Sequence, residues 1–248
     1  MTYVIYIQKL KDYHTKMSSI KPAFLAFFGI LLVSTTIITI FNNTQMNIVD
    51  ETGIVGAIEI LNYDGQDLSS INEFKENSIK GPQYLDKETY SLLITGFVDT
   101  PLAYTYEDIL NKFTHHKRVV TLHCVDGWNV TILWEGILVK DLINEAIGLP
   151  NAKIVIFHAS DGYSTSLPLS FVNKNDIMIA YKMNGVVLPP ERGFPFQLVA
   201  ESKWGYKWIK WITEIELSDD LNYKGFWESR GFSNDGDLSE DFFQVGLP

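Results

Sequence analysis

Residues 22–41 form a run of twenty residues that contains no charged side chain and is rich in Phe, Leu and Ile. At 1.5 Å per residue, a helix of this length spans about 30 Å, which matches the hydrocarbon core of a membrane. A cleaved signal peptide is the alternative, but its apolar part is usually shorter, and Ile40-Phe41-Asn42-Asn43 offers no small-residue cleavage pattern. The sequence therefore predicts one transmembrane helix that is retained.

The charges that flank this helix predict its orientation. Residues 1–21 carry four lysines against one aspartate, a net charge of +3, which leaves −13 for the remainder of a chain whose total is −10. Because positive flanks tend to stay in the cytoplasm, we expect a single-pass protein of the cell membrane with its large domain extracytoplasmic. The acidic balance disfavours nucleic acid as a partner, since phosphate contacts need clustered Lys and Arg.

The chain beyond the helix divides into a linker and one domain. Residues 42–74 are polar apart from an apolar patch at residues 54–60, which could form one short strand. Residues 75–248 are numerous enough for a domain with its own core.

Short β-type runs and helical patterns follow one another irregularly in this domain. Strands are expected at residues 90–98, 119–125, 153–158, 177–182, 196–200 and 209–217. Helices are expected at 106–113, with Thr105 as N-cap, over about ten residues after Ile137, and at 166–172. Asn184-Gly185 indicates a hairpin. The irregular order predicts a strand-rich α+β fold.

Cys124 is the only cysteine in the chain. It cannot form an intramolecular disulfide, so it serves packing, nucleophilic chemistry or the binding of a soft metal. The β-type run that contains it leads into Asp126-Gly127, so we expect the thiol at the edge between a strand and a loop. This context alone leaves packing and chemistry about equally open.

Two further segments have the composition of a ligand site. Residues 188–197 form a loop bracketed by prolines, in which Gly193 permits close approach of the backbone to a ligand. Residues 203–211 interleave Lys with Trp and Tyr, which suits an anionic planar ligand. The alternatives are a structural connector for the first segment and an alternating core strand for the second.

Taken in order, these segments resemble the molybdopterin-binding oxidoreductase domain of the sulfite oxidase family, from about Ser78 to Asp237. The matching motifs are Cys124–Trp128, Trp134-Glu135-Gly136, Asp161–Ser164, Asn184-Gly185 with Leu188-Pro189-Pro190, Gly205-Tyr206-Lys207 with Lys210-Trp211, and Gly225–Phe232. The first two are similar to the reductase-like branch, which includes the catalytic subunit of the protein-methionine-sulfoxide reductase.

The resemblance implies that Cys124 is the protein thiolate ligand of molybdenum, with the pterin dithiolene and oxo groups completing the coordination. A soft thiolate suits such a metal. Trp128 would shape the pocket beside it, so these two are the expected catalytic residues. The implied cofactor contacts are Cys124, His123, Ser160, Arg192, Gln197, Trp208, Ile209 and Lys210, with Lys80, Gln83 and Tyr84 from the loop at 77–84.

Three departures from the family bear on substrate and partner. The family usually has Asn or His at Arg192 and Arg at Gln197, so a positive charge has moved across the loop. The chain has only three arginines, which disfavours sulfite, because sulfite oxidases gather arginines around the oxyanion. A single cysteine cannot provide a haem-attachment pair, so a separate electron-transfer protein is the expected partner.

The expected function is oxygen-atom transfer on a small or sulfoxide-type substrate by a membrane-anchored molybdenum-cofactor oxidoreductase. One alternative is a non-catalytic binding module that keeps the fold without the cofactor, an idea that Gln197 favours. Another is a thiol enzyme that uses Cys124 with His123 or His158. Neighbouring strand residues point to opposite faces, so His123 is poorly placed as a base.

Overall fold

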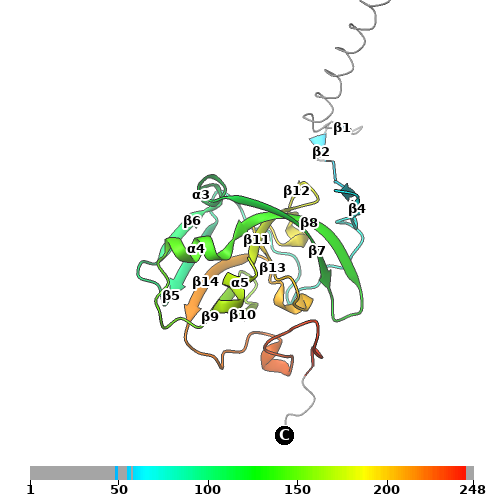
Figure 1. Cartoon of the computed structure of the whole chain (residues 1–248). Coiled ribbons are helices and arrows are strands. Elements are labelled where there is room, and N and C mark those ends of the chain that lie inside the picture. The colour runs from blue at the N-terminus through cyan, green and yellow to red at the C-terminus, as the bar shows by residue number, and fades with distance from the viewer. Residues whose placement is uncertain (1–47, 50–54, 57, 244–248) are drawn as a thin grey trace, which may run out of the picture. The chain divides into compact units, whose positions relative to one another are not determined.

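The computed structural model describes residues 48–49, 55–56 and 58–243 (Figure 1). The segment expected in the cytoplasm, 1–21, and the expected transmembrane helix, 22–41, lie outside these ranges. None of the helices in the described ranges is long and apolar enough to cross a membrane. The chain divides into two compact units between Ile58 and Glu59. In the first unit, β1 (Ile48–Val49) pairs antiparallel with β2 (Val55–Gly56).

Two five-stranded sheets form the framework of the second unit (Figure 1). The first has the order β10-β9-β14-β5-β6, and only its β14–β5 pair is parallel. Its strands are β5 (Ser91–Gly96), β6 (Leu102–Thr105), β9 (Ile154–Ala159), β10 (Ser164–Pro168) and β14 (Ile212–Ser218).

The second sheet is antiparallel throughout and has the order β12-β11-β8-β7, with β13 also paired to β11. Its strands are β7 (His115–His123), β8 (Asn129–Leu138), β11 (Met178–Met183), β12 (Val186–Val187) and β13 (Gln197–Val199). A small hairpin, β3 (Asn62–Tyr63) and β4 (Gln66–Asp67), precedes both sheets. This mixed, strand-rich arrangement confirms the expected α+β class.

Helices are short and connect the strands. They are α3 (Tyr106–Lys112), α4 (Val139–Glu145) and α5 (Leu169–Lys174), with 3-10 turns at Pro190–Arg192, Gly205–Lys207 and Glu228–Arg230. The N-cap prediction for α3 is confirmed: the Thr105 side chain accepts from the Asp108 N–H, and the Asp108 carboxylate accepts from the Thr105 N–H.

Three expected boundaries are wrong, each because strand pairing extends or ends differently from the local pattern. Residues 164–168 pair with β9, so the helix expected at 166–172 begins only at Leu169. The strand expected at 119–125 is β7, which begins at His115 and ends at His123, because it pairs with β8 over this whole range. The strand expected at 209–217 begins at Ile212, and a 3-10 turn occupies residues 205–207. The alternating-strand alternative for residues 203–211 is therefore wrong.

Residues 59–74, assigned above to a linker, pack against the second sheet. Asn184, which is fully buried in the hairpin between β11 and β12, connects these residues to the sheet. Its Oδ1 accepts from the Leu133 N–H at 2.9 Å, and its Nδ2 donates to the Ser69 carbonyl and to Glu59 Oε1, both at 2.9 Å. Leu68 and Ile71 are buried as well. The compact unit thus begins at Glu59.

Side chains from both sheets share one hydrophobic core, which includes Leu92 of β5, Trp134 of β8 and Ile179 of β11. Gly136 of β8 shows how closely its strands approach. A Cβ at this position would lie 2.2 Å from the Ile179 carbonyl oxygen of β11 and 2.7 Å from the Ala180 Cα. Only glycine allows β8 and β11 to pack this closely.

We expect Gly136→Ala to reduce the free energy of unfolding by about 1–3 kcal/mol, because the backbones of β8 and β11 must separate. Urea denaturation monitored by tryptophan fluorescence measures this change. Gly148→Ala is the matched control, since its Cβ would meet only methyl groups of Leu217 and Ile143, at 3.0 and 3.2 Å. Equal losses in the two variants would show that strand approach at Gly136 is not the constraint.

Candidate functional site

A cavity of about 580 Å³ lies where several connections of the second unit meet, a size typical of pockets for small molecules. Five stretches and two more distant side chains line it. They are the loop at 74–81, the end of β7 and the β7–β8 turn within 122–128, the β9–β10 turn at 161–163, the loop at 191–197, residues 205–211, and Trp227 with Phe232.

Cys124 lies at this cavity, one residue beyond the end of β7. A tight turn holds it: its N–H donates to the Trp128 carbonyl at 2.9 Å, and the Gly127 N–H donates to its own carbonyl at 3.1 Å. Its Sγ accepts weak hydrogen bonds from the Asp126 N–H and from Asn77 Nδ2, each at 3.5 Å. The prediction of a thiol at a strand-to-loop edge is confirmed.

The surroundings of Cys124 do not suit a thiol nucleophile. Burial raises the pKa of this thiol, and the hydrogen bond from the Asp126 N–H only partly opposes the effect. His158 Nε2 lies 2.8 Å from Glu216 Oε2, and within the described residues neither His158 nor His123 hydrogen-bonds to Sγ. A thiol enzyme needs a lowered thiol pKa or an adjacent base. The geometry therefore gives this alternative no support.

Arg192 and Gln197 both line the cavity and are both buried. The Arg192 guanidinium lies 3.8 Å from the centre of the Phe74 ring, and it donates from Nε to the Ile71 carbonyl and from Nη2 to the Phe74 carbonyl. Its Nη1 has no hydrogen-bond partner among the described residues, and neither does the Gln197 amide. The loop therefore presents one charged and one neutral donor to the cavity.

Trp208, Ile209 and Lys210 also lie at the cavity, as the resemblance implied. Lys210 Nζ pairs with Glu76, donates to the Glu191 carbonyl at 3.3 Å, and lies 4.2 Å from the centre of the Trp211 ring. Burial lowers its pKa, and the Glu76 carboxylate opposes that change.

Trp128 lines the cavity as well, next to Phe74, with a distance of 5.6 Å between ring centres. Its indole Nε1 is buried and has no hydrogen-bond partner within the part of the chain that the structure describes. It is thus a further unsatisfied donor close to Cys124.

Five of the expected cofactor contacts do not line the cavity: Lys80, Gln83, Tyr84, His123 and Ser160. Tyr84 is 75% exposed, and Gln83 Nε2 donates to the Gly81 carbonyl. The Ser160 N–H donates to the Trp211 carbonyl, and its neighbour Asp161 is the residue that reaches the cavity. The loop that carries Lys80 does contribute, but through residues 74–79 and 81.

Sequence reasoning did not single out three side chains that the structure brings to the cavity. Asn77 contacts both Cys124 Sγ and Asp126 Oδ2, the latter at 3.3 Å. Asp161 is buried and accepts from the Tyr163 N–H at 2.9 Å. Asp161-Gly162-Tyr163 was recognised as a motif, but nothing local indicated that Asp161 and Tyr163 face the cavity. The signal for Asn77 is weaker still, because its partner is 47 residues away.

Comparison with known proteins agrees with this geometry. A family model described as the oxidoreductase molybdopterin binding domain matches residues 79–227, more than half of the chain. The uncharacterized oxidoreductase YuiH of Bacillus subtilis (strain 168) is 34% identical over 157 residues, which are 63% of this chain and 78% of YuiH.

Among solved structures, the sulfane dehydrogenase SoxCD from Paracoccus pantotrophus aligns with a TM-score of 0.55 and 26% identity. The alignment covers 62% of this chain and 43% of the SoxCD chain, so this chain spans less than half of that protein. Cys124, Arg192, Gln197 and Lys210 all lie in the range that the family model matches.

Proposed function

The chain belongs to the family of oxidoreductases with a molybdopterin-binding domain, and from this we propose that it transfers an oxygen atom to or from a sulfoxide-type or other small substrate. As a member of that family it is an oxidoreductase that binds the molybdopterin cofactor. The observation that carries the proposal is a single buried thiol, Cys124, at a cavity also lined by Arg192 and Gln197, whose Nη1 and amide have no partner in the described part of the chain.

The residues at the cavity fit this cofactor. Within the described ranges no three His, Cys, Asp or Glu side chains surround a common point, so a metal held by Cys124 would take its other ligands from the cofactor. A dithiolene has the soft sulfur donors for this role. Arg192 and the Gln197 amide would bind the oxygen and nitrogen atoms of the pterin and its phosphate.

The protein residues would bind, orient and shield the reacting centre. When bound, the cofactor supplies the two-electron redox change that accompanies the transfer of an oxygen atom. Cys124 would hold the metal, and the Asp126 N–H and Asn77 Nδ2 would keep its sulfur in position. Arg192 is itself held by two backbone carbonyls, so its guanidinium is already fixed at the cavity before a ligand arrives. The buried Trp208 and Trp211 limit the access of water.

The surroundings of Gln197 do not favour a non-catalytic binding module without the cofactor. Its amide is buried at the cavity, and the charge that the family usually has at this position is present on Arg192 in the same loop. The loop therefore keeps the cation that a phosphate needs.

Membrane anchoring, an extracytoplasmic domain and a separate electron-transfer partner are further parts of the proposal. They rest on the uncharged residues 22–41, on the basic residues before them and on the absence of a second cysteine. Release of the full chain by detergent but not by high salt, together with cleavage of the domain by protease added outside intact cells, would support this topology. Release by salt alone would contradict it.

The function is tested with the full chain purified from a host that makes the cofactor. We expect about one molybdenum atom and one pterin phosphate per chain, and faster reduction of dimethyl sulfoxide by reduced benzyl viologen than oxidation of sulfite by ferricyanide. Absence of molybdenum would support the binding module instead. Faster sulfite oxidation would contradict the proposed substrate class while leaving the cofactor assignment intact.

A further inference from the structure

One part of the cavity wall is aromatic and is built from two separate regions of the chain. Tyr163 and Tyr206 come from the sheet connections, whereas Trp227 and Phe232 come from the segment after β14. Phe232 joins the two groups, with ring centres 5.2 Å from Tyr206 and 5.1 Å from Trp227. We call these four residues the aromatic wall.

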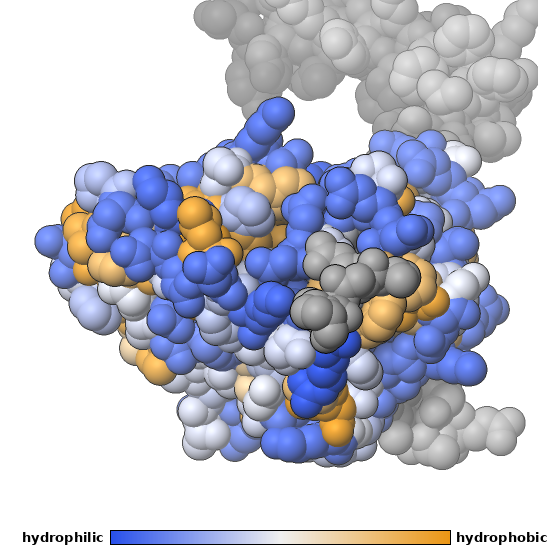
Figure 2. Space-filling view, turned by 90° about the horizontal axis from the view of Figure 1, so that it is seen from below, coloured by the Kyte–Doolittle hydropathy of each residue, from blue (hydrophilic) through white to orange (hydrophobic). Residues whose placement is uncertain are grey.

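The segment that supplies half of this wall has little regular structure of its own. After β14 the chain passes along one end of the sheets, drawn in orange to red in Figure 1, and residues 219–243 contain a single 3-10 turn at Glu228–Arg230. Seen from that end, the surface is mostly hydrophilic, with hydrophobic residues in separate patches (Figure 2). Specific side-chain contacts must therefore hold the segment in place.

One of these contacts is an ion pair that is completely buried. Lys207 Nζ and Glu228 Oε1 are 2.7 Å apart, and both side chains have no exposed surface. Lys207 Nζ also donates to the Asn234 carbonyl at 2.8 Å, and Thr165 Oγ1 of β10 donates to Glu228 Oε1 at 2.5 Å. Burial lowers the pKa of Lys207, and the Glu228 carboxylate opposes this shift.

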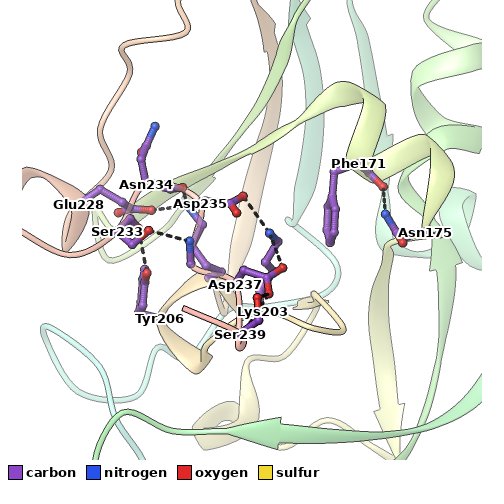
Figure 3. A network of polar contacts seen from close by, with 12 residues as sticks. Phe171, Asn175, Lys203, Tyr206, Glu228, Ser233, Asn234, Asp235, Asp237 and Ser239 are labelled. Atoms are coloured by element: carbon purple, nitrogen blue, oxygen red, sulfur yellow. Dashed lines mark hydrogen bonds and ion pairs between the residues drawn. The ribbon is translucent and has the colours of Figure 1, made fainter. Parts of the chain in front are cut away.

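A second set of contacts fixes the later part of the segment (Figure 3). Lys203 Nζ donates to Asp235 Oδ1 at 2.9 Å and to Asp237 Oδ2 at 3.3 Å. The Tyr206 hydroxyl donates to the Ser233 carbonyl at 2.8 Å. Both sets of contacts therefore join the turn at residues 203–207 to the C-terminal segment.

The position of the buried pair in the sequence links it to the aromatic wall. Lys207 directly follows Tyr206, and Glu228 directly follows Trp227, yet neither Lys207 nor Glu228 lines the cavity. The pair thus connects the chain next to Tyr206 with the chain next to Trp227, and it does so outside the cavity lining. Cys124, Arg192 and Gln197 belong to other parts of the fold and make no hydrogen bond with either member of the pair.

We propose that Glu228 is a positioning residue for the substrate side of the cavity. Through Lys207 it holds Trp227 and Tyr206 in one continuous wall, which binds the apolar part of a substrate. Loss of the charge on Glu228 weakens substrate binding and leaves the cofactor in place. The turnover part of this inference rests on the proposed function, whereas the binding part does not.

The test compares Glu228→Gln with the wild-type holoenzyme. Methyl p-tolyl sulfone, the binding probe, is titrated against tryptophan fluorescence, and methyl p-tolyl sulfoxide is the turnover probe with reduced benzyl viologen. We expect the Kd for the sulfone and the KM for the sulfoxide to rise about 10-fold, with kcat within about 2-fold and the molybdenum content unchanged. Glu240→Gln, an exposed carboxylate of the same segment, is the control and should change neither constant.

A second variant separates positioning from general damage. Lys207→Met/Glu228→Gln leaves no unpaired charge buried, but it also removes the ion pair that joins the two wall residues, so the Kd for the sulfone should stay raised. A return to the wild-type Kd would show that an unpaired buried charge was the whole cause of the loss, and it would overturn the inference. The inference is overturned if the sulfone does not bind to the wild type, if Glu228→Gln leaves its Kd unchanged, or if activity falls only in proportion to lost molybdenum. If the wild type binds the sulfone but does not reduce the sulfoxide, the proposed function fails and the Kd comparison still decides the inference.

Discussion

Cys124→Ser is expected to lose at least about 10³-fold in kcat, the largest effect of any single change in the chain. Cys124 is the only cysteine in the chain, and among the described residues that line the cavity it is the only one with a soft ligand atom. A serine oxygen is a harder donor with a much higher pKa, so it would bind the metal more weakly and alter its ligand field. Steady-state sulfoxide reduction and the electron paramagnetic resonance spectrum of the molybdenum measure the two consequences.

Serine and cysteine have nearly the same shape, so Cys124→Ser should leave the fold intact, and unfolding should not cause the loss of kcat. Cys124 is held by backbone hydrogen bonds to Trp128 and Gly127, which serine keeps. The thermal unfolding midpoint should therefore stay within a few degrees of the wild type. Full turnover with metal retained would exclude Cys124 as the ligand. Lost turnover with an unchanged molybdenum spectrum would instead indicate a nucleophile.

Features with a strong local cause could be predicted from the sequence. Thr105 caps α3 because a threonine three residues before Asp108 satisfies the free N–H groups of a helix start. Asn184-Gly185 forms the β11–β12 hairpin because both residues accept positive φ, here 48° and 80°. The edge position of Cys124 follows in the same way from the turn at Gly127. Asn184-Gly185 and the turn after Cys124 also belong to the motifs that carried the family resemblance, which the family match confirms.

Features that depend on distant partners could not be predicted. Asn77 reaches Cys124 from 47 residues away, and Arg192 is held by the carbonyls of Ile71 and Phe74, which the sequence assigned to a linker. The role of β10 as a strand depends on pairing with β9, which overrides the helical pattern of residues 166–172. The aromatic wall was the hardest feature to predict. We infer that the arrangement of its four side chains depends on Lys207 and Glu228, and charged residues are normally expected on the surface.

Lys207→Met is expected to reduce the free energy of unfolding by about 3–5 kcal/mol, because it leaves the Glu228 carboxylate buried without a cation. Both side chains are completely buried, so water cannot replace the lost partner. Glu228 Oε2 already has no hydrogen-bond partner among the described residues, so the neutral hydroxyl of Thr165 on Oε1 would be the carboxylate's one remaining side-chain donor there. Urea denaturation of the holoenzyme, with equal molybdenum content confirmed for both proteins, measures the change.

Two comparisons show whether the buried charge is the cause. Lys207→Met/Glu228→Gln removes the unpaired charge while Gln keeps an acceptor for the Thr165 hydroxyl, so most of the lost stability should return. Lys112→Met removes a lysine from an exposed pair with Glu145, where solvent screens both charges, and should have little effect. If Lys207→Met is as mild as Lys112→Met, the interior around Glu228 must admit water. The C-terminal segment would then be held by its aromatic contacts rather than by the ion pair, because a hydrated carboxylate no longer needs Lys207.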